Sequence, residues 1–122
     1  MVMSANQRYA KYITTAKGRA NALIRGAKAR CIAKGTACTV TAQQVADVIA
    51  AGHCQLTGLP FSLAPADGKM YNMYAPSIDR IDPDNYNYTP DNVRIVLAWV
   101  NIALNQHGLD ASMPIIRALA GK

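Results

Sequence analysis

Three polar side chains in the second half of the chain have the spacing of a shared oxygen-donor site. Asp79 lies in a short alternating stretch, and Asn101 and Asn105 lie four residues apart in a stretch with helical periodicity. Residues four apart on a helix project from the same side, so both amide oxygens can face Asp79. Carboxylate and amide oxygens bind hard cations such as Mg²⁺, and a set with one carboxylate binds them weakly. The spacing therefore predicts that the oxygen atoms of these three side chains face one another.

Two strands and a helix are predicted to position these side chains. Residues 77–81 alternate polar and apolar residues, and residues 93–97 are rich in β-branched residues, so each stretch predicts a short strand. The sequence DPDNYNYTPDN between them is rich in Asp, Asn and Pro, which predicts a long loop. Val100 and Leu104 continue as a helix that Gly108 is expected to end. The predicted order is strand, loop, strand, helix.

This order and spacing resemble the ββα-metal nucleases, also called HNH or His-Me finger nucleases, and especially the HNH-like proteins encoded by phages. The resemblance runs through CQLTGLPF, SIDRID, YTPDNVRIV and the VN of the helix, and it covers residues 54–108, a little under half of the chain. It implies an α+β fold with a ββα-metal core and flanking helices. It also implies an endonuclease or nickase that cleaves DNA phosphodiester bonds with Mg²⁺ or Mn²⁺.

The resemblance assigns roles to individual residues. Asp79 occupies the position of the first metal ligand, and Asn101 and Asn105 occupy the ligand positions on the helix. Asn92 matches the Asn that braces the loop of the catalytic site. Arg80 stands where the family has its general-base His, and a guanidinium cannot accept a proton from water. We therefore expect Arg80 to bind phosphate or to stabilise the developing charge.

With Arg80 in this position, a protein that cleaves DNA needs another group to activate water. The candidates are, in order, Tyr86 or Tyr88 in the loop, Asp82, and His53. A Tyr base would resemble the arrangement in some members of the family. Three hypotheses remain open. The protein is a metal-dependent endonuclease or nickase with an unusual base, an inactive relative that binds DNA, or a module that binds another protein. The alternative for the Asp and Asn side chains of the site is that they only stabilise the long turn and cap the helix.

Positive charge is concentrated towards the N-terminal end. The chain has 13 Lys and Arg against 7 Asp and Glu, and no acidic residue precedes Asp47, so residues 1–46 carry +8 and the remainder carries −2. This asymmetry predicts a polyanionic partner, and DNA is favoured over an anionic membrane surface. The alternative is a solvated face on a packed helix. The residues expected to contact DNA are Arg8, Lys11, Lys17, Arg19, Arg25, Lys28, Arg30, Lys34 and Arg94.

An amphipathic pattern predicts a long basic helix that Ser4 caps and that ends near Lys34, with Gly18 and Gly26 as the positions where it can bend or break. Apolar residues recur through it at three- and four-residue spacing, and the basic residues lie off this stripe. Arg8, Arg19 and Arg30 are eleven residues apart, which is close to three turns, so they are expected to lie along one line of the helix.

Shorter elements flank the predicted ββα core. Thr41 and Gln44 form a capping-box pattern that predicts a short helix ending at Gly52, packed on the first helix. The sequence HCQLTGLPFSL predicts a small hairpin, and a C-terminal helix is expected within residues 109–122. We expect one domain over residues 1–122, divided into a basic helical region (1–52), the ββα core (53–108) and the C-terminal helix (109–122).

Cysteine usage predicts a reducing environment and no structural zinc. The three Cys form no CxxC pair, and Cys54 is followed by Thr57 where many members of the family carry the second Cys of a zinc knuckle. An unpaired thiol fits the cytoplasm better than a disulfide scaffold, and this is the host cytoplasm for a phage protein. We find neither a signal-like segment nor roughly 18 successive apolar residues, so we expect no membrane association.

Overall fold

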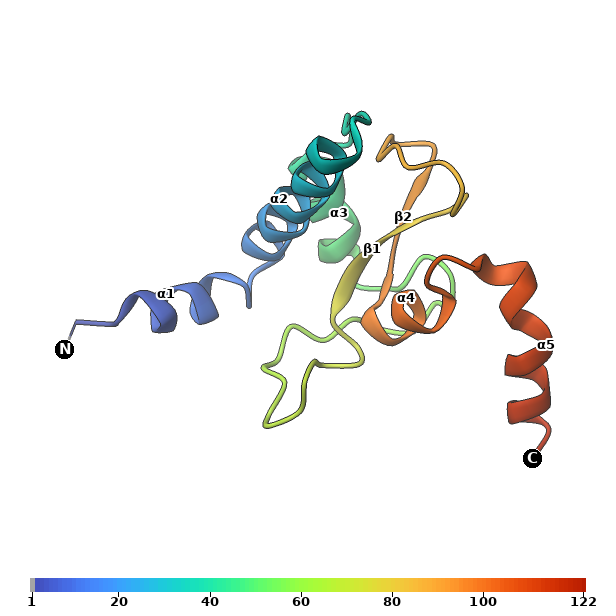
Figure 1. The fold of residues 1–122 in the computed structure, drawn as a ribbon. Helices are drawn as coiled ribbons and strands as arrows, with labels where there is room; N and C mark the ends of the chain where they lie inside the picture. The colour runs from blue at the N-terminus through green and yellow to red at the C-terminus, as the bar shows by residue number, and fades with distance from the viewer. Residues whose placement is uncertain (1) are drawn as a thin grey trace.

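The computed structural model describes residues 2–122, and these form an α+β fold with five helices and one antiparallel hairpin. The hairpin lies between a pair of helices on one side and a single following helix on the other, while the first helix extends away from the body (Figure 1). In chain order the elements are α1 (Ala5–Tyr12), α2 (Ala16–Lys34), α3 (Ala42–Ala51), β1 (Pro76–Arg80), β2 (Val93–Leu97), α4 (Ala98–Leu104) and α5 (Gly108–Ala120).

The expected long basic helix is broken between α1 and α2, close to Gly18, whereas α2 continues without interruption through Gly26. The predicted Ser4 cap is present as a capping box, but Thr15 caps a second helix. A Cβ on Gly18 would lie 1.9 Å from the Tyr12 carbonyl oxygen, so only Gly allows the first turn of α2 to pack this closely against the end of α1. The break places Arg8 on a separate helix, and the expected line of three Arg residues is lost.

The helices α2 and α3 pack together and cover one face of the hairpin. The buried side of α2 carries Ala20, Ile24, Ala27 and Cys31, as its apolar stripe predicts. Its end at Lys34 is confirmed, because Gly35 follows in the left-handed conformation with φ 69°.

The capping box of α3 and its end at Gly52 are also confirmed. Thr41 Oγ1 accepts from the Gln44 amide at 3.1 Å, and the Gln44 side chain accepts from the Thr41 amide at 2.9 Å. Val45 and Ile49 are the buried residues of α3, and they join the core that α2 and the hairpin share.

The segment between α3 and β1 is irregular. The hairpin expected over residues 53–63 is reduced to one bridge between His53 and Pro60, and the Cys54 amide donates to the Leu59 carbonyl at 2.8 Å. This turn is attached to β2 rather than extended as a strand, because Gln55 exchanges two hydrogen bonds with the backbone of Ile95.

The strands β1 and β2 pair antiparallel as predicted, in a register that places Asp79 opposite Arg94. Alternation along β1 turns Ile78 towards the core beneath α2 and α3. On the other face, Val96 packs with Val100 of α4 in a second cluster. The ββα order is therefore present, with α4 following β2 directly.

The expected end of the helix at Gly108 was wrong. The helix α4 ends at Leu104, where Asn105 turns the chain with φ 45° and ψ −134°. Gly108 is instead the first residue of α5, with φ +80°, and a Cβ there would lie 3.3 Å from Pro83 Cγ in the long loop. Thus Gly108 serves a close approach between α5 and the loop, and the C-terminal helix begins one residue before the expected range.

Candidate functional site

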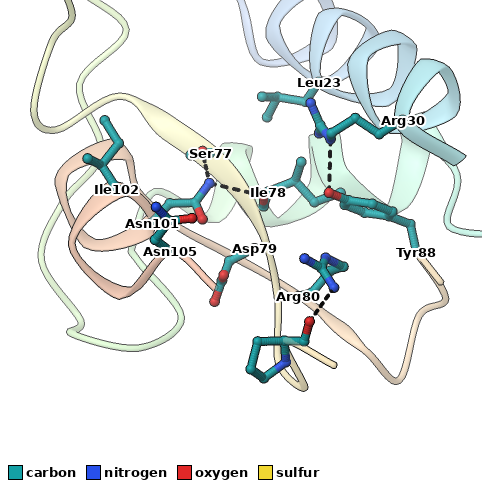
Figure 2. A pocket seen from close by; sticks show the side chains of 11 residues that line it. Leu23, Arg30, Ser77, Ile78, Asp79, Arg80, Tyr88, Asn101, Ile102 and Asn105 are labelled. Carbon is teal, nitrogen blue, oxygen red and sulfur yellow. Dashed lines mark hydrogen bonds between the residues drawn. The ribbon is translucent and has the colours of Figure 1, made fainter. Parts of the chain in front are cut away.

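A pocket of about 410 Å³ lies beside β1 and is lined from four parts of the chain. The sheet has two strands in the described residues, so one edge of β1 has no strand partner and side chains from both of its faces reach the pocket. Figure 2 shows the residues of α4 on one side of β1 and those of α2 and the long loop on the other. The lining residues are Leu23, Arg30, Ser77, Ile78, Asp79, Arg80, Pro83, Tyr88, Asn101, Ile102 and Asn105.

Asp79 is 5% exposed and forms an ion pair across the hairpin. Arg94 Nε donates to Asp79 Oδ2 at 2.7 Å, as their opposite positions in the register allow. This pairing was not predicted, since Arg94 was expected to contact DNA. No group among the described residues donates a hydrogen bond to Asp79 Oδ1. Every fully buried side-chain nitrogen or oxygen in the described residues has a hydrogen-bond partner, so Oδ1 is not fully buried and reaches solvent.

Asn101 connects α4 to β1. Its Nδ2 donates to Ser77 Oγ at 2.7 Å and to the Ile78 carbonyl at 3.2 Å, which accounts for an Asn in the middle of an otherwise apolar helix. These bonds use the nitrogen and leave the Asn101 Oδ1 lone pairs available. Asn105 lines the same pocket but lies just beyond α4, so its expected place on the helix was wrong by one residue.

The oxygen donors of this pocket fit a weakly bound hard cation. Asp79 could contribute one carboxylate oxygen, and Asn101 and Asn105, which line the same pocket, could contribute amide oxygens. Mg²⁺ accepts such a set when water and phosphate oxygens complete the coordination. Within residues 2–122 there is no cluster of three or more His, Cys, Asp or Glu able to hold a metal ion, so the protein alone supplies few ligands.

Arg80 is held in the pocket by backbone oxygens and an aromatic ring. Its Nη1 donates to the carbonyl of Pro83 at 2.8 Å and to that of Asn85 at 3.0 Å, and its guanidinium lies 4.5 Å from the centroid of the Tyr86 ring. In the described part of the chain, the Arg94 to Asp79 contact is the one ion pair. Arg80 therefore retains an uncompensated positive charge inside the pocket.

Tyr88 is the candidate base that the structure places in the pocket. It is 7% exposed, and its hydroxyl accepts from Arg30 Nε at 2.9 Å (Figure 2). The other candidates, Tyr86, Asp82 and His53, do not line the pocket. His53 lies at the end of α3, where its Nδ1 is 3.1 Å from the Ala51 carbonyl oxygen.

Asn92 braces the long loop from outside the pocket. Its Nδ2 donates to the carbonyls of Asn85 and Asn87 at 3.1 and 2.9 Å, and its Oδ1 accepts from the Asp82 amide at 3.0 Å. All three bonds fasten the loop, and Asn92 is 6% exposed. Its action on the site is therefore indirect, through the loop that carries Tyr88.

The basic residues are not one surface. Arg8 and Lys11 lie on α1, and those from residue 17 to residue 34 lie on α2. Arg19 is partly buried at the junction, where its Nε donates to the Ile13 carbonyl at 3.2 Å, and burial lowers its pKa more than the nearby Tyr9 raises it. Arg30 lines the pocket, so it is the member of this set that links α2 to the site.

Cys54 lies in the turn where the family resemblance places a zinc knuckle. Burial raises the pKa of its thiol, but hydrogen bonds from the Thr57 side chain and from backbone amides, including that of Thr57, outweigh this and lower it. The Thr57 amide donates to Cys54 Sγ at 3.4 Å. The turn is thus closed by hydrogen bonds to the sulfur.

Sequence reasoning missed the contribution of α2 to the pocket. Leu23 and Arg30 are seven residues apart, so they share one side of the helix, but the sequence does not indicate which side faces β1.

Comparison with family models, with curated proteins and with solved structures finds no match to this chain. No helix within residues 2–122 has the length and apolar character needed to cross a membrane.

Proposed function

We propose that this protein is an HNH-like, metal-dependent DNA endonuclease or nickase whose chemistry takes place in the pocket beside β1. The observation that carries the proposal is the convergence of Asp79, Arg80, Asn101 and Asn105 on one pocket. These are residues that the family resemblance places at the metal and base positions. The excess of positive charge near the N-terminal end supports a nucleic-acid substrate.

The two walls of the pocket supply different functions. Asp79 Oδ1 and the Asn101 amide oxygen would hold the ion, which when bound stabilises negative charge on the phosphate and the leaving oxygen. Arg94 holds Asp79 Oδ2, so it positions the carboxylate with Oδ1 left for the ligand. Arg80 binds a phosphate oxygen from the opposite wall, since no carboxylate among the described residues neutralises it.

Tyr88 is assigned the proton transfer. Its oxygen lies in the pocket and accepts from Arg30 Nε at 2.9 Å, and a donating cation stabilises negative charge on that oxygen. Tyr88 would take the proton of the attacking water at Oη as the phenolate, after its own phenolic proton has passed to solvent. The hydrogen bond from Arg30 also fixes the ring against α2, so the oxygen is positioned before substrate binds.

A second candidate function is DNA binding without cleavage. The ion pair favours it, because Arg94 already occupies one oxygen of the single carboxylate in the pocket. Arg80 favours it as well, since a guanidinium binds phosphate but cannot accept a proton. The two functions share the same phosphate contacts and differ in whether a cation enters beside Asp79.

Nicking of supercoiled plasmid with Mg²⁺ and with Mn²⁺ tests the proposal. Asp79→Asn keeps an oxygen that can accept from Arg94 but removes the charge, so cleavage is expected to fall at least about a hundredfold. Asp91→Asn is the matched control, because Asp91 bonds Thr89 outside the pocket.

Equal cleavage by wild type and Asp79→Asn with both ions would reject the nuclease. In that case, salt-dependent binding of duplex DNA by both proteins would establish the second candidate.

A further inference from the structure

Three cations and two tyrosine rings meet where the C-terminal end of α2 contacts the long loop. Arg30 and Lys34 come from α2 and Arg80 from β1, and we call them, with Tyr86 and Tyr88, the cation–tyrosine cluster. Lys34 Nζ lies 4.7 Å from the Tyr86 ring centroid, and the Arg80 guanidinium lies 4.5 Å from it. The Arg30 guanidinium lies 5.3 Å from the Tyr88 ring centroid. All three distances are within the range of about 6 Å for cation–π attraction.

Hydrogen bonds hold the tyrosine loop against the end of α2. Thr36 Oγ1 donates to the Tyr86 carbonyl at 3.0 Å, and the Ala37 amide donates to Asn87 Oδ1 at 2.9 Å. The Tyr88 amide in turn donates to the Ala37 carbonyl at 2.9 Å. The loop that carries the two rings is therefore fastened to the end of α2 before any ligand binds.

Acidic residues are close in sequence to this cluster but do not neutralise it. Asp82 Oδ1 accepts from the Asp84 amide at 3.0 Å, and Asp91 Oδ1 accepts from Thr89 Oγ1 at 2.5 Å. Across residues 2–122, the ion pair between Arg94 and Asp79 is the one present, and it involves no cation of the cluster. Three positive charges thus converge with aromatic rings, the Tyr88 hydroxyl and backbone oxygens as partners, an arrangement that an anionic ligand would stabilise.

The cluster also retains unused hydrogen-bond donors. Arg30 uses Nε for Tyr88, which leaves its two terminal nitrogens without a partner in the described residues. Arg80 uses Nη1 for two loop carbonyls and retains Nε and Nη2. A guanidinium that is oriented by one set of bonds and open at the other nitrogens suits bidentate binding of phosphate oxygens.

We propose that the cation–tyrosine cluster binds successive phosphates of one nucleic-acid strand, with the strand running from the pocket towards Lys34. Arg30 and Arg80 line the pocket, whereas Lys34 lies outside it and one helical turn farther along α2. The four residues from Arg30 to Lys34 rise by about 6 Å along the helix axis, which is comparable with the separation of neighbouring phosphates along a strand. The inference rests on the proposed function only in placing the first phosphate in the pocket.

Binding of a fluorescent single-stranded oligonucleotide by the full-length protein, measured by anisotropy in EDTA, tests this strand path without any cleavage. Lys34→Gln removes one phosphate contact, so the slope of log K against log salt should fall by about 0.7, and affinity at about 0.1 M salt by about fivefold. Lys69→Gln makes the same charge change in the exposed segment before β1 and is the matched control. Equal effects of the two substitutions would overturn the proposal, as would an oligonucleotide that wild type does not bind.

Substitution of Tyr86 tests whether the ring organises the cations. Tyr86 is 44% exposed and its side chain has no hydrogen bond in the described structure, so Tyr86→Phe should retain wild-type affinity, while Tyr86→Leu should weaken it about threefold. Equal affinities of the Tyr86→Phe and Tyr86→Leu variants would show that the Tyr86 ring does not organise the cations. The binding assay contains EDTA, so it is independent of the nicking assay. If the protein does not nick plasmid but its oligonucleotide binding still depends on Lys34, the nuclease is rejected and the strand path stands. If it nicks plasmid but binding does not depend on Lys34, the strand path is rejected and the nuclease stands.

Discussion

Removing Arg94 is expected to destabilise the protein strongly, because it leaves the buried carboxylate of Asp79 without its cation. The side chains of Arg94 and Asp79 are 15% and 6% exposed, and their contact is 2.7 Å long. Breaking such a pair from one side costs about 3–5 kcal/mol, and the access of Asp79 Oδ1 to solvent favours the lower end. Arg94→Met should therefore lower the free energy of unfolding by about 3 kcal/mol, and Tm by about 12 °C for a domain of this size.

A double-mutant cycle separates the unpaired charge from the loss of Arg94 packing. Asp79→Asn removes the charge, so the double variant Arg94→Met/Asp79→Asn should be more stable than Arg94→Met alone. Arg117→Met on the exposed side of α5 is the control, and it should change stability by less than about 0.5 kcal/mol. Urea unfolding of wild type and of these four variants gives the free energies of unfolding. The ion-pair account fails if Arg94→Met matches Arg117→Met, or if the double variant is no more stable than the single one.

Three further changes test the fold and its independence from metal. In thermal unfolding, Gly18→Ala should destabilise the protein by about 2 kcal/mol, because its Cβ would overlap the Tyr12 carbonyl. Gly26→Ala should be neutral or stabilising by up to about 1 kcal/mol, because its Cβ would meet only the flexible Arg30 guanidinium, at 3.3 Å. Asn101→Leu should cost about 1–2 kcal/mol in urea unfolding through the lost bonds to Ser77 Oγ and Ile78, and a wild-type value would show that these bonds contribute nothing. EDTA should leave Tm unchanged, and a large drop would reveal a structural metal.

The sequence predicted elements whose ends are set by local chemistry. The Ser4 and Thr41 caps and the glycines after α2 and α3 act within a few residues of themselves, so their patterns were sufficient. Gly18 and Gly26 were equal candidates for a break in the basic helix, and the packing of Gly18 against Tyr12, which periodicity does not report, places the break near Gly18. Gly108 was misassigned for the same reason, since its contact is with Pro83, far away in sequence.

The candidate site divides in the same way. Asp79, Asn101 and Asn105 were predicted to lie together and all three line the pocket, although Asn105 reaches it from the turn after α4 rather than through the helix period. The partners that orient that wall and the opposite one were not predicted. Arg94 reaches Asp79 through strand register, and Arg30 reaches Tyr88 across 58 residues of sequence. Such contacts depend on the packing of whole elements, which no local pattern encodes.

A crystal soaked with Mn²⁺ tests the proposed metal site beside Asp79, because the anomalous signal locates the ion without any assumption about activity. We expect a peak in the pocket beside β1, with Asp79 Oδ1 and the Asn101 amide oxygen as ligands, and no such peak in Asp79→Asn. A peak elsewhere, or a wild-type pocket that stays empty while the Arg94 to Asp79 ion pair is intact, would contradict it.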